Sequence, residues 1–174
     1  LIGLVGSEMC IRDSDSPVLA AADKIIAATG AHSVVPPIPG AHGANVIDIK
    51  DAHRDPAAIK GKKIAICGGG LSGSDFALEM ATEYGKQCTI IEMKPDVAMD
   101  MVFINQHSLK IYLKDAGVVT RTNTRVSEIV ENGVRVINEH GEQELIEADV
   151  VVAAFGMAPN TELTNALKQK YNKK

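Results

Sequence analysis

The sequence predicts an α/β fold in which a parallel sheet is accompanied by a small antiparallel β-meander. A short apolar strand, a glycine turn and an amphipathic helix follow one another over residues 63–84, and a second apolar strand follows at 87–92. Short alternating runs with turn signals occupy 126–146, which is typical of antiparallel strands joined by tight turns. A continuous apolar run at 149–154 is typical of a strand buried on both faces of a parallel sheet.

The overall composition excludes several classes of protein. With 174 residues, the chain has room for one domain, or for one domain and pieces of another. Its 45% apolar and 23% charged residues are ordinary for a globular protein, which excludes disordered and fibrous classes. The net charge of -4 and the 3% of aromatic residues disfavour a nucleic-acid partner, and no apolar run approaches the ~18 residues of a membrane span. We therefore expect small-molecule partners, with no nucleic acid and no membrane.

Neither the cysteines nor the histidines form a pattern typical of a metal or redox site. The three cysteines include no C-x-x-C pair, so a reducing, cytoplasmic location fits best, and Cys67 and Cys88 are expected to be buried hydrophobes. The histidines have no metal-ligand spacing and are expected on the surface or in linkers. They are His32, His42, His53, His107 and His140.

Residues 1–14 do not fit the pattern of the rest of the chain. This segment back-translates codon for codon into the end of a transposase sequencing adapter, so we interpret it as an assembly artefact without structure. The alternative, a short signal peptide, would need a basic start and a longer apolar core than this segment has.

The next two segments are predicted to be a strand with a crossover, and then a linker. The apolar run Lys24 to Ala28 predicts a buried strand, which leads through Thr29-Gly30 into a rigid proline-rich connection that ends at Gly40. Residues 15–40 would form one structural piece on this interpretation. The polar stretch 41–61 is expected to be an irregular linker.

Further elements follow from apolar periodicity and turn residues. The helix after the first glycine turn should bury Phe76, Ala77 and Met80 and end at Gly85. A second helix is predicted to stop at Gly117, a strand follows at 118–120, and a last helix follows Pro159. The apolar stripe of the second helix consists of Leu109, Tyr112, Leu113 and Ala116.

The segment 68–73 carries the strongest functional signal. It fits G-x-G-x-x-G, follows a predicted strand, opens a predicted helix and precedes the acidic Glu92 by about 20 residues, which is the full Rossmann dinucleotide fingerprint. Gly68 would form the tight turn, Gly70 would let the backbone approach a pyrophosphate, and Gly73 would let helix and strand pack closely. The pyrophosphate would rest on the helix N-terminus, where unpaired N–H groups and the helix dipole favour anions.

Two acidic residues near this turn have predicted roles. Glu92 can accept hydrogen bonds from both ribose hydroxyls of an adenosine and would repel a 2′-phosphate, which predicts NADH rather than NADPH. A solvated strand-end carboxylate is the alternative, and Lys94 could partly compensate a phosphate. Asp75 is placed in the first helical turn, where capping and a nicotinamide-side role are both open.

Three pieces of the sequence resemble the FAD/NAD(P)-binding fold of two-dinucleotide flavoprotein reductases, in the order that this superfamily shows. They are Ala28-Thr29-Gly30 with the proline-rich Val35 to Gly40, the fingerprint from Gly68 to Glu92, and the run from Val150 through Phe155-Gly156-Met157-Ala158-Pro159 to Asn160. The resemblance covers nearly everything from Asp23 to Leu167. The segment from Asp100 to Val118 looks most like the C-terminal half of 2,4-dienoyl-CoA and enoate reductases related to old yellow enzyme.

The resemblance implies that residues 62–154 are an NADH-binding domain inserted into an FAD-binding domain, with 155–174 crossing back to the FAD side. In the family, NADH reduces FAD, and electrons pass through an iron–sulfur cluster to FMN in an N-terminal barrel. The barrel and most of the FAD domain would be the missing parts of the intact chain, so this fragment alone is expected to be inactive. The expected cofactor-binding residues are Thr29, Gly30, Gly68, Gly69, Gly70, Leu71, Ser72, Gly73, Asp75, Glu92, Met93 and Gly156.

Three alternatives stay open at this point. One is the NADH domain of a disulfide or ferredoxin reductase, which would share the fold. A second is a methyltransferase that binds S-adenosylmethionine, although this would not explain Thr29-Gly30 or the segment 155–160. The third is a vestigial nucleotide-binding module with a structural role.

Overall fold

The structure is a computed structural model that describes residues 17–171, so the predicted artefact 1–14 and Cys10 lie outside the described residues. The described chain divides into two units, one containing 33–157 and the other containing 17–32 with 158–171. The helices are α1 (Pro17–Ala21), α2 (Ile49–Arg54), the short 3-10 turn η1 (Pro56–Ala58), α3 (Leu71–Thr82), α4 (Phe103–Asp115) and α5 (Glu162–Tyr171). The strands are β1 (Ala31–Ser33), β2 (Val46–Asp48), β3 (Lys63–Cys67), β4 (Gln87–Ile91), β5 (Val119–Arg121), β6 (Arg125–Val130), β7 (Gly133–Ile137), β8 (Gln143–Glu147), β9 (Val150–Ala153) and β10 (Met157–Pro159).

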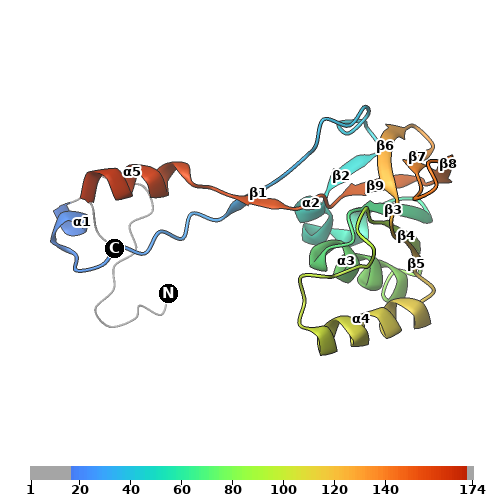
Figure 1. Cartoon of the computed structure of the whole chain (residues 1–174), viewed down its shortest axis with the longest axis horizontal. Coiled ribbons are helices and arrows are strands. Elements are labelled where there is room, and N and C mark those ends of the chain that lie inside the picture. The colour runs from blue at the N-terminus through green and yellow to red at the C-terminus, as the bar shows by residue number, and fades with distance from the viewer. Residues whose placement is uncertain (1–16, 172–174) are drawn as a thin grey trace. The chain divides into compact units, whose positions relative to one another are not determined.

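The larger unit is built around a five-stranded parallel sheet with the order β2-β9-β3-β4-β5 (Figure 1). Strand β3 pairs with β4 from Lys63↔Gln87 to Cys67↔Ile91, and α3 connects the two strands. The strand–turn–helix–strand prediction is therefore confirmed. The antiparallel meander is confirmed as well, since β6, β7 and β8 form a three-stranded antiparallel sheet.

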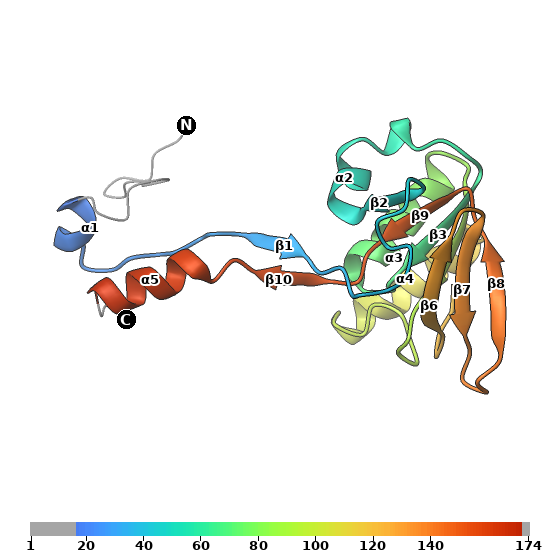
Figure 2. The same cartoon turned by 90° about the horizontal axis from the view of Figure 1, so that it is seen from above.

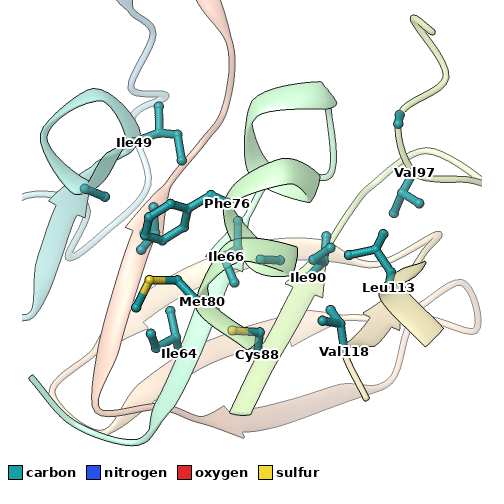
Figure 3. Close-up of a cluster of buried hydrophobic side chains, with 14 of the residues drawn as sticks. Ile49, Ile64, Ile66, Phe76, Met80, Cys88, Ile90, Val97, Leu113 and Val118 are labelled. Carbon is teal, nitrogen blue, oxygen red and sulfur yellow. The ribbon is translucent and has the colours of Figure 1, made fainter. Parts of the chain in front are cut away.

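The parallel sheet is covered on both faces, as Figures 1 and 2 show. On one face, α2, α3 and α4 cover alternate side chains of β3 and β4, and this cluster includes Ile66, Ile90 and Phe76 (Figure 3). On the other face, the intervening side chains Ala65, Cys67 and Ile91 pack with the meander. This burial on both faces explains why β9 and residues 64–67 of β3 are continuous apolar runs.

The helix α3 forms where its apolar spacing predicts. Phe76, Ala77 and Met80 are buried, and Gly85 takes a left-handed φ of 62° just beyond the helix end. The Lys86 N–H donates to the Met80 carbonyl oxygen (2.9 Å), so the chain beyond Gly85 satisfies one of the free carbonyl groups at the end of the helix. In α4, which begins at Phe103, Leu109 and Leu113 are buried as predicted, whereas Tyr112 is exposed.

The prediction that 41–61 is an irregular linker is wrong at the level of secondary structure. This stretch contains β2, which joins the parallel sheet beside β9, and the helix α2, whose Ile49 and Ala52 are buried. Asp48 caps α2 by accepting a hydrogen bond from the Lys50 N–H (2.9 Å). Both elements are too short for a helical or strand periodicity of apolar residues to be recognised. The polar residues around them therefore led to the prediction of a linker.

The prediction of a buried strand at 24–28 is also wrong. No strand is formed there, and Ile26 is 91% exposed. An apolar run becomes a strand only beside a neighbouring strand, and none of the described strands pairs with this run. The strand of this region is β1, which pairs with β10, and the division between the two units falls within this pair.

The described cysteines and the histidines lie where the sequence analysis expects them. Cys67 and Cys88 are buried free thiols, and burial raises the pKa of Cys67 to about 12 and that of Cys88 to about 11. Both thiols therefore remain protonated and unreactive near neutral pH. The five histidines are all exposed. Within residues 17–171, no helix has the length and apolar character needed to cross a membrane.

Candidate functional site

The glycine turn lies between the carboxyl end of β3 and the start of α3. Gly68 has a φ of 116°, and a Cβ placed on it would lie 2.1 Å from the backbone oxygen of Ala154, just beyond β9. Its N–H donates to the carbonyl oxygen of Ile91 in β4 (2.9 Å). The turn is thus enclosed by the ends of the two neighbouring strands, and this position accepts only glycine.

The other two glycines of the motif differ in their surroundings. A Cβ on Gly73 would lie 2.1 Å from the Gly68 carbonyl oxygen and 3.2 Å from Cγ2 of Ile66 in β3. Gly73 therefore permits close packing of α3 on the turn and on β3, in agreement with its predicted role. A Cβ on Gly70 would meet no atom within 4 Å, so the backbone faces open space at this position.

The N-terminus of α3 is available to an anion. Gly70 is the N-cap residue, and it provides no side-chain hydrogen bond to the first turn. Leu71 and Ser72 begin the helix and are exposed. Unpaired N–H groups and the helix dipole favour an anion here, and the open space at Gly70 allows a diphosphate to approach the backbone.

Glu92 follows β4 directly and lies beside this turn. Its Oε2 accepts a hydrogen bond from the Gly69 N–H (2.7 Å), and its Oε1 accepts one from the Lys94 N–H (2.9 Å). Only 8% of the residue is exposed, so the alternative of a solvated strand-end carboxylate is wrong. Ionised carboxylates offer about four acceptor positions, which leaves acceptor capacity for ribose hydroxyls.

Asp75 and Met93, the remaining predicted residues of this segment, are both exposed. Asp75 is the fifth residue of α3 and is exposed, and the first turn of the helix contains no acidic residue. Its predicted place in the first turn, and with it the capping role, is therefore wrong, because the helix begins at Leu71. Met93 is exposed and follows Glu92 on the carboxyl side of β4.

The remaining predicted residues are divided between the two units. Gly156 lies beyond the end of β9, with a φ of 117°, and its carbonyl oxygen accepts a hydrogen bond from the Val34 N–H (2.9 Å). Thr29 and Gly30 belong to the other unit, where Thr29 Oγ1 donates to the Asn160 backbone oxygen (2.5 Å). The Asn160 N–H donates to the Gly30 carbonyl oxygen (2.9 Å). Of the predicted cofactor-binding residues, those from Gly68 to Met93 and Gly156 therefore lie in the larger unit, and Thr29 and Gly30 lie in the other.

Two residues that support the turn were not identified from the sequence. Ser74 is fully buried, and its Oγ donates to the Gly69 carbonyl oxygen (3.1 Å). The Ala98 N–H donates to the same oxygen (2.7 Å). Ser74 could have been identified because its hydroxyl lies on the apolar face of a predicted helix. Ala98 could not, because it acts through its backbone N–H, which every residue except proline has.

This arrangement can bind and orient a dinucleotide. The turn and helix N-terminus match a pyrophosphate, and Glu92 matches an adenosine ribose at the end of the neighbouring strand. Fold and turn together define a Rossmann-like domain of the FAD/NAD(P)-binding type. The chain belongs to the pyridine nucleotide-disulphide oxidoreductase family, whose match extends over residues 8–174. That match begins within the segment 1–14 that the sequence analysis interprets as an artefact.

Individual relatives agree with this family assignment. The chain is 33% identical to an NADH oxidase of Thermoanaerobacter brockii over 162 residues, which is 91% of this chain and 25% of that protein. Its structure is similar to a 2-naphthoyl-CoA reductase, with a TM-score of 0.74 and 27% identity over 82% of this chain and 21% of that one. It is also similar to a NAD-dependent persulfide reductase from A. fulgidus, with a TM-score of 0.64 and 31% identity over 80% of this chain and 26% of that one. The chain thus spans about a quarter of the length of these relatives.

Proposed function

We propose that this chain is the NADH-binding part of a flavin-dependent oxidoreductase, in which hydride passes from NADH to FAD. The observation that carries the proposal is the glycine turn, with open space at Gly70, beside a buried carboxylate at the end of the next strand. Thr29, Gly30 and Gly156 would contribute to the FAD side of the intact protein. FAD would bring the hydride-accepting chemistry, while the residues of this chain bind and orient NADH.

For the complete enzyme, we propose reduction of an activated C=C bond, as in enoate or 2,4-dienoyl-CoA reductases. The similarity to a 2-naphthoyl-CoA reductase supports this choice, because that protein also reduces an unsaturated acyl-CoA according to its name. FMN and an iron–sulfur cluster would then belong to an N-terminal barrel in the rest of the polypeptide. The enzyme is proposed to be cytoplasmic.

A second candidate is the NADH domain of a disulfide or ferredoxin reductase. The similarity to a persulfide reductase, at higher identity but lower TM-score than the acyl-CoA reductase, favours it. The remainder of the intact polypeptide discriminates between the two candidates, since one requires a barrel and a cluster motif and the other a redox dithiol or a ferredoxin-binding surface. A vestigial nucleotide-binding module would bind ADP as tightly as NADH.

NADH is expected to bind at least roughly tenfold more tightly than NADPH. The 2′-phosphate of NADPH would approach the Glu92 carboxylate, and each ~1.4 kcal/mol of repulsion changes the affinity tenfold. Fluorescence titration of both cofactors in low salt measures the ratio. The variant Glu92→Arg should shift it toward NADPH, and the exposed Glu131→Gln should leave it unchanged. Equal dissociation constants in the wild-type chain would refute the predicted selectivity.

The isolated chain is expected to oxidise NADH no faster than free FAD does. Hydride transfer needs an acceptor close to the nicotinamide, and a bound FAD needs its own pyrophosphate site. Residues 17–171 contain one G-x-G-x-x-G turn between a strand and a helix, at 68–73. Absorbance at the NADH band, with FAD and an artificial electron acceptor present, measures turnover. Stoichiometric retention of FAD with turnover well above that of free flavin would contradict this expectation.

A further inference from the structure

The buried carboxylate of Glu92 connects two backbone segments on opposite sides of it. One of its oxygens accepts from Gly69, in the middle of the glycine turn, at 2.7 Å. The other accepts from Lys94, in the loop that follows β4, at 2.9 Å. These two bonds join the glycine turn to the loop after β4 through one side chain.

Gly69 is held by the same loop from its other side. Its carbonyl oxygen accepts from the Ala98 N–H at 2.7 Å. Both polar groups of Gly69 are therefore bonded to the segment 92–98, the N–H to the Glu92 side chain and the carbonyl oxygen to the Ala98 backbone. The position is also closely packed, because a Cβ on Gly69 would lie 3.0 Å from side-chain atoms of Glu92, Ile90 and Val97. The turn therefore has no space to move toward the loop.

We propose that Glu92 is a positioning residue for the pyrophosphate turn, in addition to its proposed contact with ribose. This inference rests on the proposed NADH site. It implies that Glu92 contributes to the affinity of nucleotides that have no ribose hydroxyls, because it fixes the backbone on which the diphosphate rests. A glutamine cannot replace it, since an amide has one acceptor oxygen and its NH₂ group would face one of the two N–H donors.

The test compares ADP with 2′,3′-dideoxyadenosine 5′-diphosphate, which keeps the diphosphate but lacks both ribose hydroxyls. Calorimetric titration of the wild-type chain and of Glu92→Gln gives four dissociation constants. We expect the substitution to weaken binding of both ligands, by at least about fivefold each, through the lost charge-assisted bond. The exposed Glu131→Gln is the matched control and should weaken neither. An unchanged dissociation constant for the dideoxy ligand would overturn the proposal and leave Glu92 as a ribose contact alone.

A second measurement needs no ligand. Hydrogen exchange of the Gly69 and Lys94 amides, followed by NMR, should be slow in the wild-type chain and faster in Glu92→Gln. If Glu92→Gln does not fold, Glu92→Asp replaces it, because the shorter carboxylate reaches at most one of the two amides. Unchanged exchange at both amides would overturn the positioning role. Failure of the wild-type chain to bind ADP or NADH would instead overturn the proposed function, while amide exchange would still decide the role of Glu92 in the turn.

Discussion

Gly73→Ala is expected to lower the free energy of unfolding by about 2–4 kcal/mol. The new Cβ would lie 2.1 Å from the Gly68 carbonyl oxygen, a backbone atom that cannot rotate away as a side chain could. Relief requires that α3 move away from β3, which would loosen the contact of the helix with Ile66. Urea denaturation followed by circular dichroism measures the change, and a loss of this size is a large part of the ~5–15 kcal/mol of a typical domain.

The matched control is Gly70→Ala, three residues earlier in the same motif. Gly70 has a φ of -65° and open space around its missing Cβ, so stability should change by no more than about 1 kcal/mol. NADH binding should nevertheless weaken, because the methyl group enters the space proposed for the pyrophosphate. Retention of full NADH affinity by Gly70→Ala would contradict the proposed site, and wild-type stability of Gly73→Ala would contradict the close helix packing.

Phe76→Ala should destabilise the larger unit by about 3–5 kcal/mol, the usual cost of removing a buried aromatic side chain. Phe76 is 0% exposed and lies among Ile49, Ile66 and Met80 between α3 and the sheet (Figure 3). Its ring also makes an edge contact with His53 of α2, with ring centroids 5.0 Å apart. Thermal and urea denaturation of the purified variant measure the effect.

Phe103→Ala provides the comparison for the same chemical change on the surface. Phe103 begins α4 and is 80% exposed, so its removal should change stability by no more than about 0.5 kcal/mol. The two variants lose the same atoms, and their difference therefore isolates burial. Equal losses of stability would show that the packing around Phe76 is not what holds α3 on the sheet.

Local patterns were sufficient to predict the central part of the fold. Short apolar segments predict β3 and β4, helical spacing predicts α3 and alternation predicts the meander, each with turn residues close by in the chain. In contrast, β2 was missed because its three residues become a strand only through pairing with β9, from Val46↔Val151 to Asp48↔Ala153. The same dependence on distant partners explains why the apolar run 24–28 was predicted as a strand and does not form one.

In the candidate site too, the features set by neighbouring residues in the chain could be predicted, and those set by tertiary contacts could not. The spacing from Gly68 to Glu92 predicted the turn, the helix and the neighbouring strand end, because all three follow each other along the chain. Burial of Glu92 and its two backbone donors depend on how the loop 93–98 folds back on Gly69. The amino-acid sequence alone does not predict this contact between the loop and Gly69.

The order of strands in the parallel sheet has a consequence for how the chain acquires its structure. Strand β9 lies between β2 and β3, yet it comes after both of them and after the meander in the sequence. During synthesis, the strand that pairs with both β2 and β3 is absent until the residues up to Ala153 have left the ribosome. Contacts between segments so distant in sequence slow folding, because the intervening loop must close first. Strand β9, the last strand of this sheet to be made, therefore completes the sheet, and the following Ala154 then encloses the glycine turn.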